Sequence, residues 1–161
     1  MSWHIRIQAD DFFNAYKVLK NHNELIVGPS VVCLAFSLEL YFKELHSVLK
    51  GKAPRGHNIL KLFEMLPSQI KQEIFAHDSI RQNPFNTRGN IFSPKLYDKA
   101  YTPYDRFVDQ IKTISNGFKE WRYAHEKQIL KYEESFALAL IESVKSASDA
   151  ARARSTWQVQ D

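Results

Sequence analysis

The sequence predicts an all-α protein folded as a small up-and-down helical bundle. Its 161 residues are enough for one domain whose core needs neither a disulfide nor a metal. Hydrophobic residues make up 44% of the chain, which is a globular composition, and glycine occurs only 5 times. Prolines fall between stretches of helical periodicity, and no stretch alternates like a strand. We therefore expect residues 1–155 to form the helical domain and residues 156–161 a C-terminal tail.

The first two helices are predicted from apolar periodicity and from residues that start or stop helices. Residues 9–20 place apolar side chains on one face, and Asp10 can cap this helix. The second helix is expected over residues 30–50, with the Pro-Ser pair at residues 29–30 as its start and Gly51 just past its end. Its first half is apolar nearly all round, which is typical of a helix in the middle of a bundle.

Two shorter helices are expected next. A polar turn over residues 52–57 leads into a third helix, which His57 or Asn58 can cap. A Pro-Ser pair ends this helix and begins a fourth, which runs from residue 68 to about residue 77. The apolar residues expected to face inward on these two helices are Ile59, Leu62, Phe63, Leu66, Ile70, Ile74 and Phe75.

A long loop is predicted over residues 81–102, which combine two X-Pro pairs and several aromatic residues without a clear period. A loop of this length in a compact domain is usually functional or mobile. Arg81 and Arg88 lie among its aromatic residues, and this composition is typical of surfaces that bind single-stranded nucleic acid by stacking and charge. The alternative is an ordered loop whose aromatic side chains simply cover the bundle.

Two further helices complete the predicted fold. Pro103 suits the first position of a helix whose apolar face recurs over residues 107–114. The Asn-Gly pair at residues 116–117 either breaks this helix or bends it. The last helix is expected over residues 132–152. The residues expected to be frayed beyond the core are Arg152, Arg154 and Trp157.

Charge and cysteine usage narrow the class of protein. The net charge of +4 and the pI near 9.1 are compatible with an RNA partner and equally with an acidic protein partner. The single cysteine, Cys33, lies in an apolar helical run and reads as a small core residue, which suits a reducing cytoplasm. No secretory-signal pattern occurs, and the apolar stretch at residues 31–42 is too short to cross a bilayer. We expect a cytoplasmic protein without a membrane role.

No metal or cofactor is predicted. The histidines show no His-x3-His or Cys/His spacing of the kind that metals require. The chain also lacks a P-loop, a dinucleotide-binding glycine pattern and a nucleophile elbow. The absence of these patterns excludes the common nucleotide-hydrolysing and serine-hydrolase sites.

Two stretches of the chain carry a family resemblance. Residues 35–45 (AFSLELYFKEL) form an apolar helix with an embedded acid and lysine, and Gly51 follows as a stop. Residues 53–63 (APRGHNILKLF) then provide a Pro-Arg-x-His-Asn turn into the next helix. Late in the chain come residues 121–123 (WRY) and Glu126. This combination resembles the HEPN superfamily.

The resemblance implies an all-α bundle that is often dimeric. Many HEPN proteins are ribonucleases or toxins of defence and toxin–antitoxin systems, and others bind nucleotides, nucleic acids or proteins without catalysis. The resemblance therefore implies a homodimer that engages RNA or nucleotides, with metal-independent RNA cleavage as one form of that activity. The alternative is a non-catalytic interaction module for a protein partner, in which the Trp-Arg-Tyr segment is structural.

Arg122 and His125 are the candidate catalytic residues. Three positions apart on a helix, they would share a face and could approach one phosphate. Histidine can move a proton near neutral pH, and arginine can stabilise the charge of a phosphorane with its bidentate fork. Catalytic HEPN proteins carry an arginine, four to six residues and then a histidine, whereas two residues separate Arg122 from His125 here.

Glu39 motivates a structural interpretation of the same arginine. It lies between two leucines on the most apolar helix, where a carboxylate needs a partner. Lys43, four residues on, is one candidate, and Arg122 is the other. In the polar turn, Arg55 and His57 are either a solvent-facing residue and a helix cap, or the cation and the donor of a phosphate-binding rim.

Overall fold

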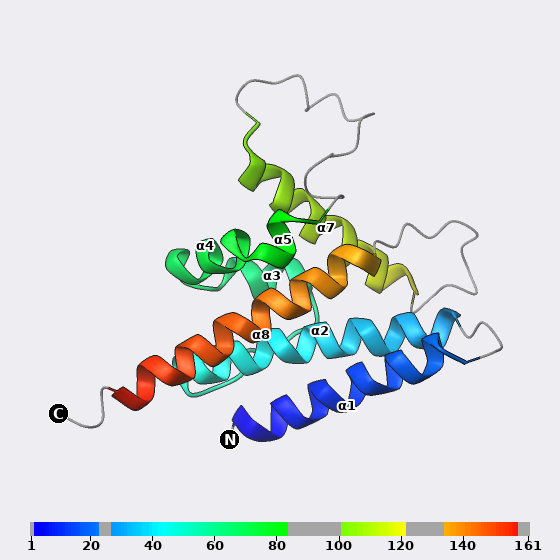
Figure 1. The fold of residues 1–161 in the computed structure, drawn as a ribbon, viewed down its shortest axis with the longest axis horizontal. Coiled ribbons are helices and arrows are strands. Elements are labelled where there is room, and N and C mark those ends of the chain that lie inside the picture. Colours follow the sequence, from blue (N-terminus) through cyan, green and yellow to red (C-terminus); the bar gives the residue numbers. More distant parts are fainter. Residues whose placement is uncertain (1, 23–26, 84–100, 122–133, 158–161) are drawn as a thin grey trace.

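All regular structure in the described part of the chain is helical. The computed structural model describes residues 2–22, 27–83, 101–121 and 134–157, and every element within these ranges is an α-helix (Figure 1). This confirms the predicted all-α class. Three predicted site residues lie outside the described residues: Arg88, Arg122 and His125.

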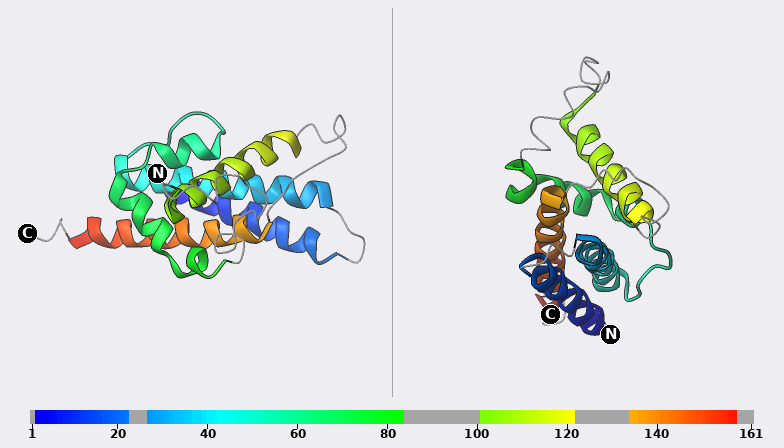
Figure 2. Two further views of the ribbon diagram at one scale, coloured as in Figure 1. Left: turned by 90° about the horizontal axis from the view of Figure 1, so that it is seen from above. Right: turned by 90° about the vertical axis from the view of Figure 1, so that its right-hand side faces the viewer.

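Seven helices are described, and the longest of them lie side by side. The elements are α1 (Ser2–Lys20), α2 (Val27–Lys50), α3 (Ile59–Glu64), α4 (Ser68–Ala76), α5 (Asp78–Arg81), α7 (Pro103–Trp121) and α8 (Glu134–Trp157). Helix α1 runs antiparallel to α2, and α8 packs against α2 as well (Figures 1 and 2). Helix α7 packs on α2 and α3, while α4 and α5 pack on α8. The central position predicted for the most apolar helix is confirmed for α2.

The first two helices start earlier than predicted. Helix α1 begins at Ser2, so Asp10 lies inside it and the expected N-cap role of Asp10 is wrong. The Asp10 carboxylate instead accepts a hydrogen bond of 2.5 Å from the Tyr41 hydroxyl of α2. Helix α2 begins at Val27 and includes Pro29 in its first turn, where a missing N–H costs nothing because it would have no helical partner.

The starts of α3 and α7 follow the predicted pattern. Asn58 caps α3, because its side-chain oxygen accepts from the backbone N–H of Lys61 at 2.9 Å. Helix α7 begins at Pro103 as predicted. Thr102 and Asp105 hydrogen-bond to each other's backbone N–H at this start, in the manner of a capping box. The helix continues through the Asn-Gly pair to Trp121, so that pair does not break it.

The end of α8 is tied down rather than frayed. The helix runs to Trp157, and Arg154 forms a two-pronged contact with Glu73 of α4 at 2.8 and 3.0 Å. These hydrogen bonds hold the pKa of the Glu73 carboxyl below its usual range. Arg152 donates to Glu44 of α2. The prediction that both arginines lie frayed beyond the core was therefore wrong, because each has a carboxylate partner on another helix.

Glu44 is a fully buried carboxylate that joins three helices. It accepts hydrogen bonds from Ser148 and Arg152 of α8, and the Arg6 guanidinium of α1 lies 3.8 Å away. A buried charge without partners would destabilise the fold, so these contacts offset its desolvation. The sequence pattern indicated a need for partners at Glu39, and the buried position of Glu44 was not predicted.

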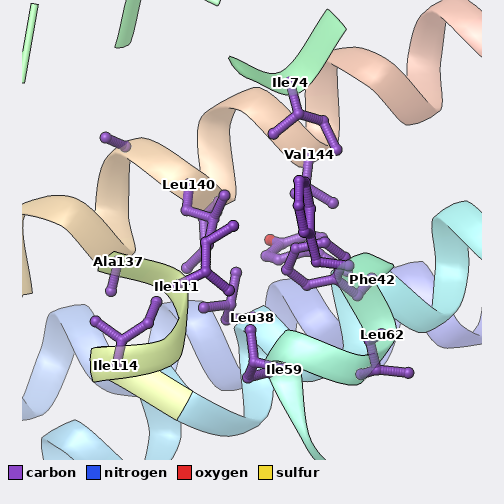
Figure 3. Packing of buried hydrophobic residues seen from close by; sticks show 14 of the residues in the cluster. Leu38, Phe42, Ile59, Leu62, Ile74, Ile111, Ile114, Ala137, Leu140 and Val144 are labelled. Carbon is purple, nitrogen blue, oxygen red and sulfur yellow. The ribbon is translucent and has the colours of Figure 1, made fainter. Parts of the chain in front are cut away.

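The hydrophobic core forms where α2, α3, α7 and α8 converge (Figure 3). Phe107 of α7 stands at its aromatic centre, with ring centroids 5.5 Å from Phe63 and 6.0 Å from Phe136. Each such large apolar side chain contributes about 1.5–3 kcal/mol when fully buried. The labelled core residues in Figure 3 are Leu38, Phe42, Ile59, Leu62, Ile74, Ile111, Ile114, Ala137, Leu140 and Val144.

Among the residues that the structure describes, none of the helices combines the length and the apolar character needed to cross a bilayer.

Candidate functional site

A buried carboxylate on α2 holds an exposed histidine from the following turn. Glu39 is 4% exposed near the middle of α2. Its Oε1 atom lies 2.8 Å from Lys43 Nζ and 2.8 Å from His57 Nδ1. Lys43 is the partner expected from the i, i+4 spacing, and the contact with His57 was not foreseen. We call Glu39, Lys43 and His57 the Glu39 cluster.

Two glycines let the chain return from the end of α2 to its middle. Gly51 has φ +74° and its N–H donates to Ser47 O at 2.9 Å, which closes the helix in the usual way. Gly56 has φ +100°, a backbone conformation that side-chain-bearing residues rarely adopt. The 51–58 turn therefore depends on glycine directly before His57. Without this path, His57 would not reach Glu39.

The far end of the turn is anchored to α7. The Ser115 hydroxyl of α7 donates to Asn58 Oδ1 at 3.3 Å and accepts from the Leu60 N–H at 3.4 Å. Ser115 is buried, and Asn58 is the cap of α3. The position of His57 is therefore set on one side by Glu39 and on the other by its neighbour Asn58.

Burial differs sharply across the His57–Glu39 contact. The His57 side chain is 64% exposed, whereas that of Glu39 is 5% exposed. Because a carboxylate only accepts, Nδ1 carries the hydrogen of this bond. In neutral His57 the other ring nitrogen, Nε2, therefore bears the lone pair. Within the described part of the chain, no hydrogen-bond partner occupies Nε2.

The surroundings of His57 are rich in cations. Residues 50–61 contain four basic residues and no aspartate or glutamate. These basic residues are Lys50, Lys52, Arg55 and Lys61, and all four are exposed. The Lys50 ammonium donates to Met65 O at 3.1 Å, which folds it toward the end of α3. An exposed imidazole among exposed cations suits a negatively charged ligand such as a phosphate.

The structure brings some predicted site residues together and separates another. Arg55 and His57 share the turn and are both exposed, as predicted. Arg81 is exposed as the last residue of α5, which packs on α4 and α8. It is helical, so the predicted start of the long loop was too early. The structure gives no account of Arg88, nor of the expected Arg122–His125 and Glu39–Arg122 pairs, because Arg88, Arg122 and His125 lie outside the described residues.

A metal centre has no support in the described ranges. No group of three or more histidine, cysteine, aspartate or glutamate side chains there could hold a metal ion. Cys33 is partly buried against the core, and burial raises the pKa of its thiol. This agrees with a packing role rather than a reactive one.

Comparison with known proteins does not assign the chain to a family. No family, no curated protein and no solved structure matches it.

Proposed function

We propose that this is a HEPN-like protein that engages RNA or nucleotides, with the phosphate held at the 51–58 turn. The observation that supports this most is the exposed His57, held by the buried Glu39 within a turn that carries only cationic charges. The motif resemblance described above covers the same residues. The all-α fold is compatible with it.

The turn has the chemistry that phosphates require. Arginine binds a phosphate with two parallel hydrogen bonds, and lysine acts as a point charge. Arg55 and Lys52 would supply these groups. If two or three such residues contact RNA phosphates, the logarithm of the affinity should fall with the logarithm of salt concentration with a slope of about −1.4 to −2.

Metal-independent RNA cleavage, in a defence or toxin–antitoxin setting, extends the proposal. That reaction needs a group that moves protons and a cation that stabilises the phosphorane. The cations of the 51–58 turn could serve the second task. Arg122 and His125 remain candidates for the same chemistry, and a homodimer could combine two sites.

The proposal is tested by measuring the binding of a labelled single-stranded RNA in EDTA, with fluorescence anisotropy as the readout. The double variant Lys52→Gln, Arg55→Gln should weaken binding at least tenfold. The matched control, Lys17→Gln with Lys71→Gln, removes the same charge from α1 and α4 and should bind like the wild type. Competition by a mononucleotide distinguishes a nucleotide site from an RNA site. If neither RNA nor nucleotide binds, the proposal fails and an interaction module becomes the better reading.

A further inference from the structure

We infer that His57 is the proton-transfer residue of this site, with Glu39 as its positioning residue, in the cleavage of RNA phosphodiester bonds. This inference rests on the proposed engagement of RNA, and it adds the group that performs the chemistry. Proton transfer is thereby assigned to the contact between Glu39 of α2 and His57 of the turn. It does not require the predicted pair Arg122 and His125.

The geometry favours a working histidine over a purely structural one. A buried histidine that stabilises a fold has its polar ring atoms engaged within the protein. His57 instead uses Nδ1 to bind Glu39 at 2.8 Å and leaves most of its ring in solvent. A rigid carboxylate behind an exposed imidazole holds the ring orientation and the tautomer, which is the arrangement that general bases use.

Glu39 is well placed to act through His57 rather than on a substrate. It is buried within α2, so an RNA strand in solvent would meet His57 first. Lys43 binds the same carboxylate oxygen at 2.8 Å and holds it in place on α2. The Glu39 carboxylate accepts the Nδ1 hydrogen and stabilises the imidazolium that forms when Nε2 takes up a proton.

The reaction can be written with its atoms in balance. Nε2 of His57 removes the proton of a ribose 2′-hydroxyl, and the 2′-oxygen forms a bond to the adjacent phosphorus. The bond from phosphorus to the 5′-oxygen breaks, and that oxygen leaves with the electron pair and takes a proton from water. The imidazolium returns its proton to solvent. The products are a 2′,3′-cyclic phosphate and a 5′-hydroxyl, and no oxidant, reductant or added water is consumed.

The charges around His57 come from two elements. Glu39 and Lys43 face it from α2, and Arg55, with Lys52, shares its turn. The carboxylate holds the Nδ1 side of the ring, and the basic side chains of the turn suit the phosphate of the substrate.

The first experiment measures RNA cleavage by the wild type and by two histidine variants in EDTA. The probes are tRNA and a labelled RNA oligonucleotide, with a 2′-O-methyl copy of the oligonucleotide as the blocked substrate. His57→Ala should lower the cleavage rate about 100-fold or more while RNA binding changes less than threefold. Added imidazole should restore part of the rate. His4→Gln removes another exposed histidine, from α1, and should cleave like the wild type.

The second experiment tests the positioning role of Glu39. Glu39→Gln keeps the size of the side chain but not its charge, so the imidazolium loses its stabilising partner. The maximal rate should therefore fall more than KM changes. A purely structural role of Glu39 would leave the maximal rate of the folded variant unchanged.

The outcomes separate this inference from the proposed function. Equal cleavage by wild type and His57→Ala would overturn the role of His57 while RNA engagement stands. Binding of RNA without cleavage, or cleavage of the 2′-O-methyl oligonucleotide, would also overturn the role of His57. Absence of both binding and cleavage would overturn both. Loss of cleavage in His57→Ala, with imidazole rescue and unchanged binding, would establish the inference.

Discussion

Ser115 of α7 and Asn58 of the turn are joined by a hydrogen bond of 3.3 Å across 57 residues of sequence. Through this contact the cap of α3 is tied to the helix that packs over it. His57 directly precedes Asn58, so the same contact supports the residue that reaches Glu39. A local capping signal and a long-range contact therefore act on the same turn.

The first prediction concerns the Asn58 cap. Asn58→Ala removes the acceptor for the Lys61 N–H and for Ser115, and should lower the free energy of unfolding by about 1 kcal/mol. Urea denaturation measures this change. Asn58→Asp keeps the acceptor and should retain most of the stability. Equal losses in the two variants would contradict the capping role.

The second prediction separates the two ends of the Glu39–His57 contact. His57→Gln should lower the free energy of unfolding by less than about 1 kcal/mol, because His57 is mostly exposed and Glu39 keeps Lys43 as a partner. Glu39→Ala should cost about 2–3 kcal/mol, because it leaves the largely buried Lys43 ammonium without this partner. Chemical denaturation of both single variants and the double variant gives the coupling between them. A large cost for His57→Gln would indicate a structural histidine.

The third prediction concerns Glu44. Glu44→Ala leaves Arg152 and Ser148 without their shared acceptor and should lower the free energy of unfolding by about 3–5 kcal/mol. Ser148→Ala removes one donor only and should cost about 1 kcal/mol. Thermal denaturation followed by circular dichroism compares the two. Similar small losses would show that the carboxylate is not the hub of the three helices.

The fourth prediction is a loss of stability on acidification through His46. Burial lowers the pKa of His46, whose Nε2–H donates to Leu62 O at 2.8 Å. The unfolded chain therefore binds a proton more readily, and stability falls as pH drops from about 6.5 through the folded-state pKa. Between pH 7.5 and pH 5, the wild type should lose more stability than His46→Gln. Parallel urea titrations at the two pH values measure the difference, and equal losses would contradict it.

The fifth prediction compares two glycines with equal space around them. An added Cβ at Gly56 or at Gly28 would meet no atom within 4 Å, but only Gly56 has a positive φ, of +100°. Gly56→Ala should therefore cost about 1–2 kcal/mol and weaken RNA binding, since the strained turn carries Lys52 and Arg55. Gly28→Ala lies in a helix and should be neutral or stabilising by up to about 1 kcal/mol. Denaturation and anisotropy on both variants test this, and equal effects would show that backbone conformation is not the cause.

Helix starts and stops show what local chemistry could predict. The cap candidate Asn58, the helix start at Pro103 and the stop at Gly51 are confirmed, because each depends on residues within one turn of helix. The start of α1 was placed seven residues late. Its first turns have little apolar periodicity, and the structure shows Trp3 and Ile7 exposed there. The N-cap chemistry of Asp10 then suggested a start that the structure does not have.

Three features could be predicted from the amino-acid sequence alone: the helical class, the central position of α2 and the requirement of the Glu39 carboxylate for a partner. Periodicity, caps and the rarity of buried carboxylates are properties of short segments, so they can be read without coordinates. Only the tertiary structure decided that His57 reaches Glu39 and that Glu44 joins α1, α2 and α8. Such contacts depend on the path of a glycine turn and on how helices distant in sequence pack, and no local pattern encodes either.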